Sequence, residues 1–297
     1  MALKLKRSLL FVPGNNPAML QSCASLGADC VILDLEDAVA PRHKDEARRL
    51  VTYALRCLSF GDVGKVVRIN DVSTPWWEAD LIEVVPANPD VIRLPKVEST
   101  DDICTVDRKI SELERANGLP EGGIGLHILL ESARAVENVA NLVRSCSRVK
   151  GIGLGEQDLM ADMGIRRTLS GEELAYVKSR VVLAAKAARI DCFDSVYTDI
   201  DNMEGLLAST KLAAAMGFAG KSAIHPSQIR VINEGFYPPE EILFHAMDVI
   251  AAAKVARAEG RGVFSVNGKM VDGPVIRQAI HVLAQAGIPC DPEEVLP

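Results

Sequence analysis

The chain has 297 residues, of which 48% are hydrophobic and 25% are charged, a composition typical of a globular protein with a large core. The net charge of −7 excludes a general affinity for nucleic acid, because there is no basic excess to neutralise phosphates. No apolar run approaches the roughly 18 residues of a membrane span, so we expect no membrane segment.

The N-terminus and the cysteines favour a cytoplasmic protein. The first seven residues are basic, but the apolar stretch behind them covers only Ser8 to Val12 and is too short for a secretory signal. The seven cysteines form an odd set without a Cys-x-x-Cys motif, which favours neither a disulfide framework nor a zinc site. A reducing compartment fits this pattern.

Apolar runs of β character alternate with helical patterns along most of the chain. These runs are Ser8–Val12, Cys30–Leu33, Lys65–Ile69, Asp90–Leu94, Ile124–Leu130, Val149–Leu154, Ile190–Phe193 and Gly220–Ile224. Eight such strands, each followed by helix-like sequence, predict a TIM (β/α)₈ barrel over residues 1–235. A doubly wound open sheet is the alternative. Its dinucleotide loop is only weakly indicated, because the glycines at 151, 153 and 155 lack the last glycine of that motif.

Residues 236–297 are not needed to close a barrel, and we predict C-terminal helices with a lid segment. Glycines flank a lysine and an aspartate in the stretch Gly268 to Gly273, which includes Lys269 and Asp272. This pattern favours an extended or mobile segment with polar chemistry. A plain surface hairpin is the alternative.

Two carboxylates stand at the outgoing ends of consecutive strands. Glu131 directly follows the run that ends at Leu130, and Asp158 comes shortly after the run that ends at Leu154. In a βαβ unit these ends lie side by side, on the face where barrels build their active sites. A carboxylate pair there suits Mg²⁺, which takes one or two protein carboxylates and leaves positions open. Alternatively, Glu131 caps the next helix and Asp158 pairs with Arg166.

Other polar residues converge on the same face. They are Asn15, Asn16, Glu36, Asp37, Arg68, Asn70, Lys96, Glu98 and His225. Arg68 is suited to grip a substrate carboxylate with its planar fork, or else to pair with Glu36 or Asp37. Lys96 at a strand end suggests a Schiff base, but a carboxylate neighbour keeps an amine protonated. Lys221 is expected to point toward the wrong face. His225 could act as an acid or base, and with Pro226 next to it a turn-fixing role is equally open.

Seven motifs, in order, resemble one known family. They are Arg7-Ser-Leu-Leu-Phe-Val-Pro13, Asp34-Leu-Glu-Asp-Ala-Val39, Arg68-Ile-Asn70, Pro95-Lys-Val97, Gly155-x-x-Asp158-Leu, Gly220-Lys-x-x-Ile-His-Pro-x-Gln228 and Gly268-Lys-Met-Val-Asp-Gly-Pro274. Together they are similar to the citrate lyase β-subunit-like (CitE-like) group of the HpcH/HpaI aldolase family, which includes malyl-CoA and citramalyl-CoA lyases. One departure is Ser132 after Glu131, where many relatives carry threonine; it leaves the metal ligand intact.

The resemblance implies a Mg²⁺-dependent barrel, commonly a homotrimer, that cleaves or forms a carbon–carbon bond in a 3-hydroxyacyl thioester. It implies Glu131 and Asp158 as metal ligands and Arg68 as a catalytic and carboxylate-binding residue. Glu36 and Asp37 would hold Arg68 or metal-bound water. Asp272 would be a catalytic lid residue that transfers a proton.

The expected substrate is a CoA thioester such as citramalyl-CoA or malyl-CoA, cleaved by a retro-Claisen reaction to acetyl-CoA and a 2-oxo acid. Arg7 or the turn at Asn15 and Asn16 is expected to touch the carrier's phosphate. Two enzymatic alternatives stay open: a citrate lyase β-subunit acting on citryl-acyl carrier protein, and a divalent-metal aldolase acting on free 2-oxo acids. A non-catalytic barrel is a third alternative.

Overall fold

The computed structural model describes residues 5–168 and 171–296, which form two compact units. Residues 6–232 make up the larger unit, and Leu5 with residues 233–296 make up the smaller one. Residues 1–4, which begin the basic N-terminal segment, lie outside the described residues. Within the described ranges, none of the helices combines the length and apolar composition that crossing a bilayer requires.

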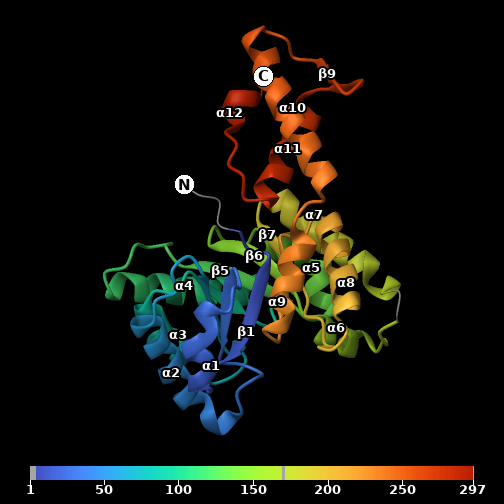
Figure 1. Ribbon diagram of the computed structural model, residues 1–297. Helices are drawn as coiled ribbons and strands as arrows, with labels where there is room; N and C mark the ends of the chain where they lie inside the picture. Colours follow the sequence, from blue (N-terminus) through green and yellow to red (C-terminus); the bar gives the residue numbers. More distant parts are fainter. Residues whose placement is uncertain (1–4, 169–170, 297) are drawn as a thin grey trace. The chain divides into compact units, whose positions relative to one another are not determined.

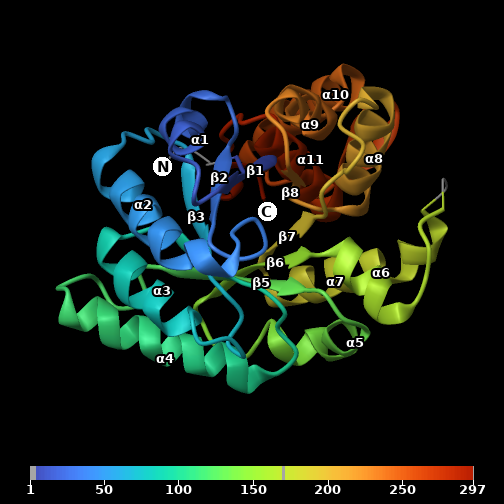
Figure 2. The same cartoon turned by 90° about the horizontal axis from the view of Figure 1, so that it is seen from below.

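The larger unit is a closed barrel of eight parallel strands in chain order (Figure 2). The strands are β1 (Ser8–Pro13), β2 (Cys30–Asp34), β3 (Gly64–Arg68), β4 (Val91–Leu94), β5 (Gly125–Leu130), β6 (Val149–Leu154), β7 (Asp191–Asp194) and β8 (Gly220–Ala223). Pairing of β1 with β8 closes the sheet, so the predicted TIM barrel is confirmed and the open sheet is wrong.

Helices follow the strands and surround the barrel (Figures 1 and 2). They are α1 (Pro17–Ser22), α2 (Lys44–Cys57), α3 (Trp77–Val84), α4 (Thr100–Ala116), α5 (Ala133–Leu142), α6 (Glu156–Met163), α7 (Ala175–Ala188), α8 (Met203–Met216) and α9 (Ser227–Phe236). Local sequence sets several of their ends. Ser99 and Asp102 form a capping box at the start of α4, and left-handed Gly164 and Gly217 end α6 and α8.

The barrel interior contains a layer of apolar side chains and, nearer the C-terminal ends of the strands, a layer of charged side chains. Leu9, Cys30, Ile32, Val66 and Phe193 form the buried cluster. Strand register then aligns three charged residues on neighbouring strands: Asp34 pairs with Arg68 and Arg68 with Arg93. In a parallel barrel, aligned residues with inward side chains share a level of the interior. This level forms the floor of the site.

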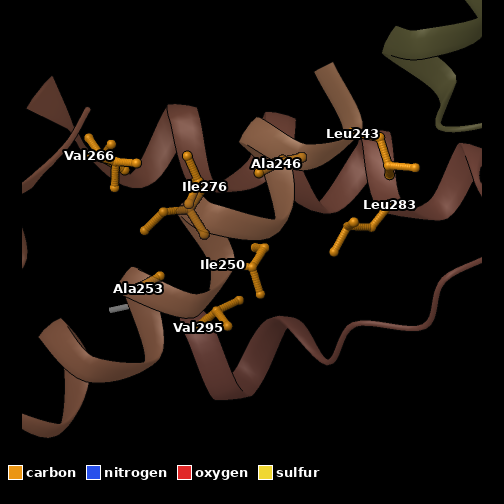
Figure 3. Packing of buried hydrophobic residues seen from close by; sticks show 11 residues of the cluster. Leu243, Ala246, Ile250, Ala253, Val266, Ile276, Leu283 and Val295 are labelled. Atoms are coloured by element: carbon orange, nitrogen blue, oxygen red, sulfur yellow. The ribbon is translucent and has the colours of Figure 1, made fainter. Parts of the chain in front are cut away.

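The C-terminal unit has a core of its own. It contains α10 (Glu240–Ala258), α11 (Gly273–Gln285), α12 (Pro292–Val295) and the antiparallel hairpin of β9 (Phe264–Val266) and β10 (Lys269–Val271). Side chains from α10, α11, α12 and β9 pack together in Figure 3. Asn267 and Gly268, both with positive φ, make the two-residue turn. The segment considered as a lid therefore contains a hairpin, as the alternative expected.

Candidate active site

Glu131 and Asp158 meet at the mouth of the barrel. Glu131 directly follows β5, and Asp158 lies in the first turn of α6. Both residues line two cavities, of about 370 and 410 Å³. The first cavity reaches the floor at Arg68 and Arg93, and the second extends past Asp71 and Lys96. The pair therefore stands where two spaces open to a substrate.

The structural alternative for this pair is wrong. Ser132, not Glu131, caps α5, because its side chain accepts the N–H of Ala135. Asp158 forms no ion pair within the described part of the chain, and the arginine that pairs nearby is Arg167, which contacts Glu156 at 2.9 Å. Neither carboxylate has the purely structural role that the alternative required.

Glu131 is held in a buried and negatively charged environment. Its side chain is 7% exposed, and its Oε2 accepts the backbone N–H of Lys96 at 2.8 Å. Burial, followed by the negative charges of Glu36 and Asp158, raises the pKa of Glu131 to about 7. A cation placed between Glu131 and Asp158 would reduce the electrostatic repulsion between these carboxylates.

The space around Glu131 fits a hard cation that takes two protein carboxylates. A Cβ added to Gly155 would lie 2.6 Å from Cγ and 2.8 Å from Oε1 of Glu131, so only glycine leaves room for the carboxylate there. The protein supplies only this pair, because within the described residues no cluster of three or more His, Cys, Asp or Glu side chains is arranged to hold a metal. The two carboxylates match a Mg²⁺ ion that fills its other positions with water and substrate.

Arg68 is surrounded by carboxylates. Its Nε and Nη2 donate to the two oxygens of Asp34 at 2.7 and 2.6 Å, and its Nη1 lies 2.7 Å from Glu36 and 3.3 Å from Asp37. The ion-pair alternative is therefore right, although sequence analysis did not name Asp34, the main partner. One edge of the guanidinium is occupied, so a substrate carboxylate can only use the remaining Nη protons.

Lys96 contacts the same acids. Its Nζ lies 2.8 Å from Glu36 and 3.5 Å from Asp37. Partial burial would lower the pKa of Lys96, but these carboxylates outweigh it and raise the pKa. The amine stays protonated, which excludes the Schiff-base role. Its backbone has a φ of 51°, a left-handed conformation that is uncommon for a lysine.

A buried ionic network lies beside the cavity. Asp194 binds Lys221 at 2.6 Å and Lys178 at 2.9 Å, and Lys178 also binds Glu156 at 2.8 Å. Lys221, which was expected to point toward the wrong face, is buried against Asp194 and lines neither cavity. The predicted β7 ended one residue too early to include Asp194 in the strand.

Two other expectations concern the strand ends. The turn-fixing role of His225 agrees with the structure, because its Nδ1 contacts Ser227 at 2.7 Å and its backbone N–H donates to Gln228. The expectation that Arg7 touches a carrier phosphate is wrong. Arg7 precedes β1, at the end opposite to the active-site loops, and its guanidinium is occupied by both oxygens of Asp29.

Asp272 belongs to the C-terminal unit. Its side chain caps α11 by accepting the N–H of Val275. Its role at the barrel site therefore stays a prediction.

Arg93, on the cavity floor, was missed by sequence analysis. The signal was a charged residue within the otherwise apolar strand sequence Val91-Ile-Arg-Leu94.

Comparison with known proteins gives consistent matches. The family model "HpcH/HpaI aldolase/citrate lyase" matches residues 7–226. The citrate lyase subunit beta of Leuconostoc mesenteroides subsp. cremoris is 41% identical over 95% of this chain and 94% of its own length. The mitochondrial citramalyl-CoA lyase of Rattus norvegicus is 34% identical over 95% of this chain and 86% of its own.

A solved structure gives the same result. CitE from Mycobacterium tuberculosis, in complex with magnesium, acetoacetate and coenzyme A, superposes with a TM-score of 0.76 and 34% identity. The match covers 95% of this chain and 98% of that one.

Proposed function

The chain belongs to the HpcH/HpaI aldolase/citrate lyase family and is a lyase, and we propose that it cleaves a 3-hydroxyacyl thioester by a Mg²⁺-dependent retro-Claisen reaction. The products are a 2-oxo acid and an acetyl thioester. The observation that carries this proposal is the Glu131 and Asp158 pair at the junction of two cavities. The cavity that reaches Arg68 and Arg93 suits the acid portion of the substrate.

The residues have distinct roles in this proposal. Glu131 and Asp158 hold Mg²⁺, which when bound supplies a Lewis acid that lowers the pKa of the substrate hydroxyl. Arg68 offers its remaining Nη protons to the carboxylate on the carbinol carbon, while Asp34, Glu36 and Asp37 fix its orientation. Pre-orientation of this kind reduces the entropy that the reaction must lose.

Asp272 is our candidate for proton transfer. A base removes the hydroxyl proton, the bond between the carbinol carbon and the thioester α-carbon breaks, and the α-carbon is protonated to give the acetyl thioester. As a lid residue, Asp272 would also help to exclude water. We expect the active protein to be a homotrimer, which sedimentation equilibrium tests.

Citramalyl-CoA, malyl-CoA and citryl thioesters are all candidate substrates, carried by CoA or by an acyl carrier protein. CoA is our first choice for a chain that works alone. A relative named as citrate lyase subunit beta supports the carrier-protein alternative, and the aldolase part of the family description supports a free 2-oxo acid substrate. The presence of Glu131, Asp158 and Arg68 together argues against a non-catalytic barrel.

The test is release of free acetyl-CoA from citramalyl-CoA, malyl-CoA and citryl-CoA by the purified chain, with Mg²⁺ and then with EDTA. We expect release from at least one thioester, with loss of activity in EDTA and in Glu131→Gln and Asp158→Asn. Glu137→Gln is the control, because Glu137 is an exposed acid on α5. No release from any CoA thioester, with cleavage of a carrier-bound or free-acid substrate, would favour the corresponding alternative.

A further inference from the structure

Arg93 is a buried cation for which the described residues provide neither a hydrogen-bond acceptor nor an ion-pair partner. Its side chain is 1% exposed, and its Nε and Nη2 are buried and donate no hydrogen bond to any group in the described residues. The other buried arginines have ion-pair partners: Arg148 donates to Glu114 and Asp107, Arg68 to Asp34 and Arg48 to Asp80. An unpaired buried charge is costly to a fold, so its presence needs a cause.

The guanidinium of Arg93 lies at the floor of the 370 Å³ cavity that Arg68, Glu131 and Asp158 also line. Its Cζ is 6.0 Å from the ring centre of Phe11 and 5.9 Å from that of Phe193. The faces of these two rings attract the cation, but they accept no conventional N–H···O hydrogen bond and carry no negative charge. Arg93 therefore belongs to the substrate space and not to the structural ion pairs of the barrel.

Neighbouring groups leave the guanidinium open to an anion. Two strands along the barrel, β6 carries Gly153, where an added Cβ would lie 3.8 Å from Nη2 of Arg93, so no side chain from this position covers it. Arg68 lies 4.9 Å from the Phe11 ring that Arg93 also contacts. Burial, followed by the positive charge of Arg68, lowers the pKa of Arg93 to about 10. Arg93 remains protonated at neutral pH, and an anion would relieve the repulsion.

We propose that Arg93 binds a second carboxylate of the substrate. The preferred thioester then carries one carboxylate on the carbinol carbon and another one carbon further on, as a citryl group does. The 2-oxo acid released is a dicarboxylate and not a monocarboxylate. This inference rests on the proposed function and selects among its candidate substrates.

The physical reason is that a buried polar group left without its partner costs more free energy than a small misfit in an apolar pocket. A thioester with a methyl group or a hydrogen in place of the carboxymethyl group leaves Arg93 desolvated and unpaired. A site built to hydrogen-bond a group rejects analogues that lack it far more strongly than an apolar pocket rejects an extra methylene. Arg93 therefore discriminates between thioesters with and without the second carboxylate more strongly than the shape of the cavity could.

The first test is binding and needs no turnover. Malate and lactate both offer a hydroxyl beside a carboxylate, but only malate has the second carboxylate. Calorimetric titration with Mg²⁺ present is expected to show malate binding about a hundredfold tighter, with Arg93→Met removing this difference and Arg93→Lys restoring part of it. Equal affinity of the two acids for the natural chain, or equal weakening of both by Arg93→Met, overturns the inference.

A stability measurement separates a binding role from a structural one. Without ligand, Arg93→Met removes an unpaired buried charge, so its Tm is expected to equal or exceed that of the natural chain. Arg148→Met, which leaves buried Glu114 without its cation, is the matched control and is expected to melt earlier. A fall in Tm for Arg93→Met as large as that for Arg148→Met identifies a structural residue and overturns the inference.

Turnover distinguishes this inference from the proposed function. We expect kcat/KM for citryl-CoA to exceed that for citramalyl-CoA, and Arg93→Met to abolish this preference. If neither CoA thioester is cleaved but malate is still bound selectively through Arg93, the proposed cleavage of CoA thioesters fails, whereas the assignment of Arg93 to a second carboxylate stands. If both are cleaved and Arg93→Met slows them equally, the function stands and the inference fails.

Discussion

Glu131 owes its position to main-chain geometry. The N–H of Lys96 fixes one carboxylate oxygen, and the absent side chain of Gly155 leaves space for the rest of the group. The carboxylate is thus held before any metal arrives, which lowers the entropic cost of binding.

Gly155→Ala tests this arrangement. Because the new methyl group would lie 2.6 Å from Cγ of Glu131, the carboxylate must move, and we expect Mg²⁺ affinity to fall by about tenfold or more, as when groups that orient a ligand are lost. Calorimetric Mg²⁺ titration measures this. Gly262→Ala is the control, because nothing lies within 4 Å of the added atom. Unchanged affinity in Gly155→Ala would show that Glu131 is not a ligand.

The buried ion pairs of Asp194 predict how the free energy of unfolding depends on pH. Burial alone would raise the pKa of Asp194, but Lys221 and Lys178 hold it below its ordinary value of 3.8. Its stabilisation is therefore present above the unfolded-state pKa and is lost as pH falls through the lower folded-state pKa. Asp194→Asn leaves buried Lys221 without its carboxylate, while Lys178 keeps Glu156, and is expected to cost about 3–5 kcal/mol at neutral pH.

Urea unfolding followed by tryptophan fluorescence measures this cost, because Trp76 and Trp77, the two tryptophans of the chain, both lie in the barrel unit. Asp191→Asn in the same strand removes a half-exposed pair with Lys6 and is expected to cost about 1 kcal/mol or less. Equal costs for the two variants would argue against the buried network.

The sequence predicts Arg68 at the end of β3 and the polar residues that follow the strands, but not the roles of Asp34 and Arg93. Glu131 and Asp158 could be located because the polarity changes where a buried strand ends. Asp34 and Arg93 lie within strands, and whether a strand residue faces the barrel axis depends on register and tilt. No single strand sequence contains that information.

At the scale of elements, the start of α11 has two interpretations. Asp272 caps this helix, and aspartate is a common cap for structural reasons alone. A variant that keeps the cap while removing the acid separates this role from catalysis.

Asp272→Asn is expected to keep α11 capped, since asparagine and aspartate cap equally well, and to reduce turnover strongly with little change in Mg²⁺ affinity. Asp272→Ala should lose turnover and also about 1 kcal/mol of stability. Asp291→Asn provides a control, because Asp291 caps α12 in the same unit. Full turnover in Asp272→Asn would remove Asp272 from the mechanism.

The order of strands and helices could be predicted because strong apolar periodicity marks each one. The boundaries of β7 were less certain, since its end, Asp194, is a charged residue that the pattern assigns to a loop. Partners 27 and 16 positions away, Lys221 and Lys178, make that charge compatible with burial. Such pairs are invisible to a local pattern.

At the scale of the whole molecule, Mg²⁺ should act as a stabilising ligand of the barrel unit. A ligand that binds only the folded state at 100 times its Kd adds about 2.7 kcal/mol, or about 5 °C or more in Tm for a unit of this size. We expect this rise in a thermal scan followed by tryptophan fluorescence, its reversal by EDTA, and its absence in Glu131→Gln. An equal rise in that variant would place the ion elsewhere.

Closure of the barrel was predictable from the number of strands, whereas the separate apolar core of the C-terminal unit was not. Residues 233–296 bury their own apolar cluster, and the sequence pattern alone describes them only as helices and a turn. Their pairing into a separate core depends on contacts between α10 and α11 that are distant in sequence.

The contact between Lys96 and Glu131 has a consequence for how this site changes in evolution. The group that holds the carboxylate is a backbone N–H, so it is present in every amino acid except proline. The codon for residue 96 can therefore drift, within the residues that tolerate a positive φ, without loss of the contact. A search for invariant side chains would pass over a position that is nevertheless under constraint on backbone shape.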